Sequence, residues 1–101
     1  MRTTPFRQAE EEALAAMTPD ERARFDAAEA EEEARLQLAE LVYGARTRAG
    51  LTQTELARRM GTQQSVISAV ENGGQVPSVS TLWRIAHALD LRLTIDMAAA
   101  S

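Results

Sequence analysis

Cysteine and lysine are both missing from this chain of 101 residues, and only four of its residues are aromatic. Without cysteine there can be no disulfide framework, no thiolate zinc site and no cysteine nucleophile. No run of about 18 apolar residues occurs, which argues against a membrane span. The opening residues lead into glutamates and not into an apolar stretch, so the sequence predicts no secretory signal. Together these absences fit a cytoplasmic protein.

Residues suited to catalysis are scarce as well. His87 is the single histidine, and no second histidine or cysteine is present to complete a metal site with it. The sequence has no glycine-rich phosphate loop, and its glutamates lie in helical runs and not in a shaped calcium loop. We therefore expect neither an enzyme nor a cofactor or metal site.

Charge is divided unevenly along the chain. Residues 1–40 contain eleven acids and five arginines, a net charge of -6, whereas residues 41–101 contain four acids and six arginines, a net charge of +2. A mildly basic domain suits a phosphate backbone, whereas an acidic helix is repelled by DNA and attracted to a basic protein. The alternative is that the acidic run is only a solvated helical face.

A block of small and apolar residues between Gln53 and Val70 has the spacing of two short helices that cross at a turn. Ala57 is small where the helices would touch, and Gly61 can turn the chain at positive φ. Apolar residues fall on the inner side of both helices, at Leu56, Ile67 and Val70. Outward positions of the second helix carry amides and hydroxyls, the groups that contact DNA base edges: Gln63, Gln64, Ser65 and Ser68.

Further helices are indicated by their N-terminal signals. Thr18 with Glu21 forms a capping box before an alanine- and glutamate-rich run that reaches Arg35, and Thr52 with Glu55 forms another. The apolar face of that run is thin, so it either folds on a partner or continues into the helix that follows, from Leu36 to Ala49. The remaining signals are caps at Thr62 and Ser78 and a helix end at Asn72-Gly73-Gly74.

The C-terminal stretch alternates apolar and polar residues, with the apolar ones at Leu91, Leu93, Ile95 and Met97. This period of two predicts a strand, although nothing else in the chain has a strand pattern to pair with it. Its backbone groups could be paired by a second copy or by the sheet edge of another protein. The alternative is that Asp90 to Met97 is a frayed extension of the preceding helix.

Three stretches resemble the Xre family, the lambda-repressor and Cro-like DNA-binding proteins: Ala45 to Ala57 (ARTRAGLTQTELA), Gly61 to Ser65 (GTQQS) and Val70 to Gly73 (VENG). The likeness extends from roughly Leu36 to Leu91. It implies an all-α, lambda-repressor-like helix-turn-helix bundle. Residues 1–35 would form an acidic helical arm, and residues 36–101 the helix-turn-helix domain with its short C-terminal β-strand.

The resemblance implies roles for individual residues. Gln53 matches a position that contacts phosphate at a helix N-terminus, and Gln64 matches one that can pair bidentately with adenine. Arg46 and Glu71 match an ion pair that ties the first helix of the bundle to the end of the recognition helix. The full set of implied DNA contacts is Gln53, Thr62, Gln63, Gln64, Ser65, Ser68, Asn72 and Gly73.

An acidic arm before an Xre domain also resembles the HigA-type antitoxins of bacterial toxin–antitoxin operons. This resemblance implies a repressor of its own operon that neutralises a small basic ribonuclease of the RelE and HigB type. The implied toxin-binding residues are Phe25, Glu29, Glu31, Glu32, Glu33 and Leu36. The main alternative is a stand-alone, phage-like transcriptional regulator without a toxin partner, and a third is an adaptor that does not bind DNA.

One recognition helix covers only a few base pairs, so sequence-specific binding usually needs two half-sites. We therefore expect a homodimer on operator DNA. Its interface is expected at the last helix and the strand, around Trp83, Leu91, Leu93 and Ile95.

Overall fold

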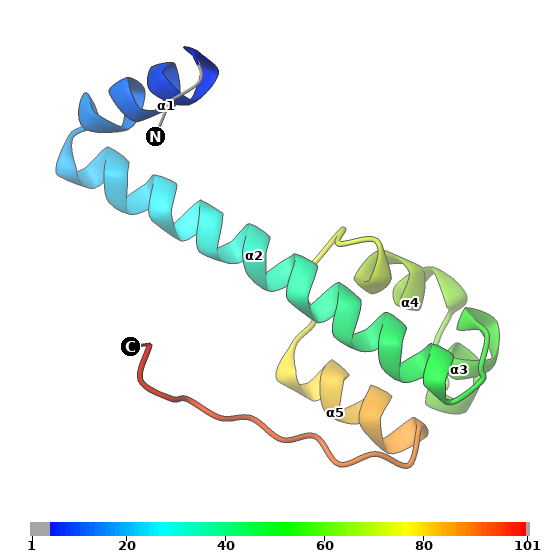
Figure 1. Cartoon of the computed structure of the whole chain (residues 1–101). Helices are drawn as coiled ribbons and strands as arrows, with labels where there is room; N and C mark the ends of the chain where they lie inside the picture. The colour runs from blue at the N-terminus through cyan, green and yellow to red at the C-terminus, as the bar shows by residue number, and fades with distance from the viewer. Residues whose placement is uncertain (1–4, 101) are drawn as a thin grey trace. The chain divides into compact units, whose positions relative to one another are not determined.

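The computed structural model of the chain describes residues 5–100, and residues 1–4 and Ser101 of the expected arm and domain lie outside that range. Five helices follow one another (Figure 1): α1 Pro5–Ala15, α2 Pro19–Arg48, α3 Gln53–Met60, α4 Gln64–Glu71 and α5 Val79–Ala88. The chain divides into two compact units, one through Glu32 and one from Glu33 onward. None of the described helices is both long enough and apolar enough to cross a membrane.

The first unit contains α1 and the beginning of α2, and the predicted capping box between them is confirmed. The backbone N–H of Glu21 donates to Thr18 Oγ1 at 3.2 Å, and the N–H of Thr18 donates to Glu21 Oε2 at 3.4 Å. Pro19 occupies the first helical position, where its missing N–H costs nothing. No residue of α1 is buried, so this unit has little apolar core of its own.

The long helix α2 resolves the alternative that the sequence left open. It runs without interruption from Pro19 to Arg48, so the alanine- and glutamate-rich run continues directly into the first helix of the bundle. Burial is confined to its C-terminal part, where Ala39, Val42 and Arg46 face inward. The helix is therefore acidic and exposed at its beginning, and it becomes a core element towards its end.

The second unit is a bundle in which α3, α4 and α5 gather around the C-terminal part of α2 (Figure 1). Its core consists of Val42, Leu56, Ala57, Ile67, Val70, Ile85 and Leu89. The predicted inward positions Leu56, Ile67 and Val70 are confirmed, since each is 0% exposed. Ala57 is also buried, as the crossing of two short helices requires.

The turn between α3 and α4 differs from the prediction by one residue. Gly61 has φ 70°, as expected, and its N–H and that of Thr62 donate to Arg58 O and Ala57 O, which closes α3 in a Schellman motif. The predicted cap at Thr62 is wrong, because α4 begins one residue later than expected. Gln63 is the N-cap of α4, and its side chain makes no capping hydrogen bond.

The predicted caps of α3 and α5 are confirmed. Thr52 Oγ1 accepts the N–H of Glu55 at 3.0 Å, and Ser78 Oγ accepts the N–H of Thr81 at 3.0 Å. After α4 the chain turns at Gly73, where φ is 75°, a backbone conformation that favours glycine.

The predicted C-terminal strand is wrong, and so is the alternative of a frayed helix. Asp90 turns the chain out of α5 with φ 57°, and residues 91–100 form neither a strand nor a helix. A strand requires a partner for its ladder of hydrogen bonds, and the described residues provide none. Leu91 and Leu93 instead line an apolar hollow of about 90 Å³ between α2 and α5.

Candidate nucleic-acid interface

The outward face of α4 carries the side chains that the sequence placed at DNA base edges. Gln63, Gln64 and Ser65 are exposed, whereas Ser68 is half-buried. This orientation follows from the opposite face, because Ile67 and Val70 are fully buried and fix the rotation of the helix. An eight-residue helix anchored by two buried side chains thus presents a polar surface to solvent.

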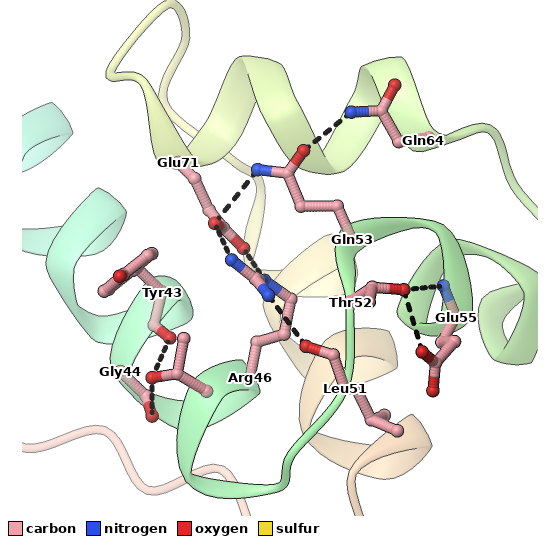
Figure 2. Close-up of polar contacts among 10 residues, drawn as sticks. Tyr43, Gly44, Arg46, Leu51, Thr52, Gln53, Glu55, Gln64 and Glu71 are labelled. Atoms are coloured by element: carbon pink, nitrogen blue, oxygen red, sulfur yellow. Dashed lines mark hydrogen bonds and ion pairs between the residues drawn. The ribbon is translucent and has the colours of Figure 1, made fainter.

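A bidentate ion pair ties this helix to α2 (Figure 2). Arg46 Nε donates to Glu71 Oε2 at 2.7 Å, and Arg46 Nη2 donates to Glu71 Oε1 at 2.8 Å. The third nitrogen of the guanidinium is hydrogen-bonded as well, since Nη1 donates to the carbonyl of Leu51 at 2.7 Å. The Glu71 side chain is only 5% exposed, so the pair is shielded from water. Its geometry fixes where the end of α4 lies.

The carboxyl group of Glu71 is ionised in spite of its burial. Burial alone would raise its pKa, but hydrogen bonds from Arg46 and Gln53, together with the charge of Arg46, hold the pKa below its ordinary value. The hydrogen bond to Glu71 likewise raises the pKa of Arg46, although desolvation opposes it. Each partner therefore stabilises the charged form of the other.

Gln53 extends this network to the exposed face of α4. No pattern in the sequence indicated this link. Its Nε2 donates to Glu71 Oε1 at 3.1 Å, and its Oε1 accepts a hydrogen bond from Gln64 Nε2 at 2.6 Å (Figure 2). Both ends of the Gln53 amide are occupied, so its orientation is defined by Glu71. Gln64 retains its carbonyl oxygen and one N–H, the pair of groups that bidentate contact with adenine uses.

Tyr43 is a further neighbour of the network that the sequence did not indicate. Its ring lies 5.4 Å from the Arg46 guanidinium carbon, within the range of a cation–π contact. The two residues stand three positions apart on α2, the spacing at which helical side chains meet. A tyrosine three residues before the arginine is the one signal that could have identified this contact.

The turn after α4 contains Asn72 and Gly73, two of the DNA contacts that the resemblance implies. The N–H of Asn72 donates to Ser68 O and that of Gly73 donates to Val70 O, at 2.9 and 3.2 Å. The next N–H, that of Gly74, donates to Ala69 O and to Asn72 Oδ1. These hydrogen bonds close the end of α4 and fix the conformation of the turn that contains Asn72 and Gly73.

The residues expected to bind a toxin all lie on α2, and they divide between the two units. Phe25, Glu29, Glu31 and Glu32 belong to the first unit, and Phe25 is half-buried there. In the second unit Glu33 accepts a hydrogen bond from Gln37 Nε2 at 3.1 Å, and Leu36 is 54% exposed. The glutamates are exposed in both units.

The residues expected at a dimer interface occupy two different surfaces of the second unit. Leu91 and Leu93 line the apolar hollow beside α2 and α5, and Ile95 follows them in the exposed tail. Trp83 instead stacks on His87 of the same helix, with ring centroids 4.9 Å apart. The expected interface is therefore partly apolar and partly aromatic.

Known proteins similar to this chain agree with the helix-turn-helix arrangement described above. A helix-turn-helix family model matches residues 43–95. Antitoxin HigA1 of Mycobacterium tuberculosis (strain H37Rv) is 42% identical over 64 residues, which are 63% of this chain and 42% of that protein. Antitoxin HipB of Escherichia coli (strain K12) is 36% identical over 59 residues, which are 58% of this chain and 67% of HipB.

Two further similarities extend the comparison. The ImmF control region 10 kDa protein of Bacillus phage phi105 is 37% identical over 59 residues, covering 58% of this chain and 66% of that protein. A chain from the structure of a HipB variant–O2 20mer complex superposes with a TM-score of 0.56 at 34% identity, over 64% of this chain and 90% of that one. The chain matches only about two fifths of the length of HigA1.

Proposed function

The chain belongs to the helix-turn-helix family, and on that premise we propose that it is a sequence-specific DNA-binding antitoxin. In this proposal it represses its own operon and neutralises a basic ribonuclease of the RelE and HigB type. The names of two relatives, HigA1 and HipB, both contain the word antitoxin and support this assignment.

The observation that carries DNA binding is the chain of contacts from Arg46 through Glu71 and Gln53 to Gln64. Side-chain amides on a surface are normally free to rotate, whereas here an ionised carboxylate fixes the orientation of two of them. Preorganised amides lose less conformational entropy when they contact a base. Gln64 is the proposed base contact, orientated by Gln53. The other proposed DNA contacts lie around it: Gln63, Ser65 and Ser68 beside it, Thr62 at the preceding turn, and Asn72 and Gly73 at the turn that follows α4.

Toxin binding is proposed for the acidic part of α2. Glu29, Glu31, Glu32 and Glu33 are exposed on one continuous helix with Leu36. A basic ribonuclease must hold RNA phosphates with cations, and exposed carboxylates can occupy those cations in place of RNA. Phe25 and Leu36 would be the apolar anchors of that contact.

A homodimer on DNA completes the proposal, since two half-sites give the specificity that one short helix lacks. Leu91, Leu93 and Ile95 provide apolar surface for a two-fold contact beside the hollow between α2 and α5. A stand-alone regulator is the second candidate, and the likeness to a phage control region protein favours it.

Co-expression with the reading frame next to this gene separates the two candidates. We expect the neighbour to arrest growth alone and this chain to restore growth. Removal of residues 1–32, which leaves the second unit complete, should abolish the rescue and preserve DNA binding. A neighbour that is harmless alone, or whose toxicity persists in the presence of this chain, would exclude the antitoxin role and leave the regulator.

A further inference from the structure

An aromatic and cationic surface lies where α3 and α5 end. We call it the Trp83 face, and it surrounds a hollow of about 150 Å³ lined by Arg59, Met60, Trp83, Arg84, His87 and Ala88. Trp83 is 56% exposed, and its ring is nearly parallel to that of His87, with 9° between the planes. The proposed DNA and toxin contacts do not use this surface.

Two reciprocal hydrogen bonds hold the arginines of the Trp83 face in place. Arg84 of α5 donates through Nη2 to the carbonyl of Met60 at the end of α3, at 2.8 Å. Arg59 of α3 donates through Nη1 to the carbonyl of Ala88 at the end of α5, at 3.4 Å. Each guanidinium uses one donor nitrogen in this way, and both residues remain exposed. Their charges are therefore fixed beside the tryptophan and accessible to a partner.

The charge of this surface argues against a symmetric contact with itself. The residues that line the hollow include two arginines and no acid. In a two-fold contact the same surface meets itself, which would bring four guanidinium groups together. Like charges placed opposite one another cost free energy, so the Trp83 face suits an acidic partner that also carries apolar surface.

Helix α1 has that composition, and most of its residues are exposed. It has 11 residues, none of which is buried, and helices shorter than about 12–15 residues are marginal in water without packing. Phe6 is 81% exposed, and Glu10 follows four positions later, so the two share a helix face. An aromatic ring and a carboxylate thus stand side by side on a helix that needs a partner.

We propose that α1 of one copy docks on the Trp83 face of a second copy, with Phe6 against Trp83 and Glu10 against Arg84 or Arg59. Reciprocal exchange of α1 between two copies closes a dimer in which each copy provides one acidic helix and one cationic face. The contact uses other residues than the proposed toxin and DNA surfaces and than the proposed two-fold contact at Leu91, Leu93 and Ile95, so it does not depend on them.

The chain's single tryptophan reports directly on this contact. We expect the emission of Trp83 to change with protein concentration together with dimer formation in sedimentation. Both should weaken between low and high salt, because exposed charges are screened. A fluorescence change that does not depend on concentration would overturn the proposal. Self-association that leaves the emission of Trp83 unchanged would also overturn it, because that is the result expected when only the contact through Leu91, Leu93 and Ile95 forms.

Charge reversal tests the pairing itself in the full-length chain. Glu10→Arg and Arg84→Glu should each weaken self-association several-fold, whereas an equimolar mixture of the two variants should associate again, because each opposing pair is restored. Glu12→Arg is the matched control, since it changes the charge of α1 equally but stands more than half a turn from Glu10. If Arg84→Glu strengthens association, the contact is a symmetric one and the proposal is wrong.

Arg84→Glu could also disturb the end of α3, because Arg84 donates to Met60 O. Arg84→Gln retains a side-chain N–H for that carbonyl and removes the charge. We expect Arg84→Gln to unfold at the same urea concentration as the parent chain. It should self-associate about twofold to thirtyfold more weakly, because a reciprocal dimer loses two exposed ion pairs. Unchanged self-association of a folded Arg84→Gln would overturn the proposal.

Discussion

Helices α4 and α1 differ in what determines their conformation. Helix α4 has only eight residues, yet Ile67 and Val70 are fully buried and Glu71 is held by Arg46. Helix α1 is longer, with 11 residues, and buries none of them. The stability of a short helix depends more on the apolar surface that the helix buries than on the helix propensity of its residues. We therefore expect the second unit, which contains α4, to account for most of the free energy of unfolding. We expect the conformation of the first unit, residues 1–32, which we call the acidic unit, to change when a partner binds.

The sharpest test of this difference is a cavity in the core. Ile67→Ala should lower the free energy of unfolding by about 2–5 kcal/mol, because it removes buried methyl groups and leaves a void. Phe25→Ala, in the acidic unit, should change the same quantity by much less, since Phe25 is only half-buried. Urea unfolding followed by circular dichroism measures both. Equal losses would mean that the two units unfold as one cooperative structure.

Glu71 provides the second test. Glu71→Ala should cost about 3 kcal/mol, because it leaves the Arg46 guanidinium largely buried without its counter-charge. The pKa of Glu71 is lowered in the folded chain, so this carboxylate stabilises the fold above its unfolded pKa. That stabilisation is lost as the pH falls below the ordinary value of 4.5 and through the folded pKa.

The pH dependence distinguishes this ion pair from the other carboxylates. In Glu71→Gln the acid-side loss of stability should be smaller than in the parent chain, as measured by urea unfolding at several pH values. Glu40→Gln is the control, because it makes the same chemical change at an exposed position of α2. The same pH profile in all three proteins would show that Glu71 contributes nothing to acid sensitivity.

The bundle was largely predictable from the sequence because its signals are local and agree with one another. Ala57, Gly61 and the buried Leu56, Ile67 and Val70 stand at fixed spacings, and Thr52 and Ser78 cap their helices as expected. The resemblance also implied that Arg46 meets Glu71, and the structure contains that ion pair. Local patterns of this kind determine where helices begin and which face they bury.

Features that depend on distant residues could not be predicted in the same way. The link from Glu71 through Gln53 to Gln64 joins two helices, and no spacing within either one indicates it. The period of two after Leu91 was correct as a pattern, but a strand needs a partner that the described residues do not contain. Thr62 has a side chain suited to an N-cap, yet it belongs to the turn that closes α3, and α4 begins one residue later than predicted.

The third test concerns the exposed face of α4. Gln64→Ala should weaken binding to the preferred DNA sequence by about 1–3 kcal/mol, measured on a duplex selected from a random library. Gln53→Ala should weaken it too, since Gln53 orients Gln64. Combining the two changes should cost less than the sum of the single effects, because the residues share one hydrogen bond. Unchanged affinity and sequence preference in Gln64→Ala would remove Gln64 from base recognition.

The smallest expected effects come from the N-cap hydrogen bond, which both units contain. Thr52 and Thr18 each accept an N–H from a glutamate three residues later, at 3.0 and 3.2 Å. Thr52→Ala should cost about 1 kcal/mol of unfolding free energy, the usual value of a lost cap. Thr18→Ala removes an equivalent hydrogen bond from the unit with little core, so it should reduce helical content without moving the main unfolding transition. If both variants shift that transition equally, the first unit unfolds together with the bundle. The exposure of its residues would then not mean that it folds independently of the second unit.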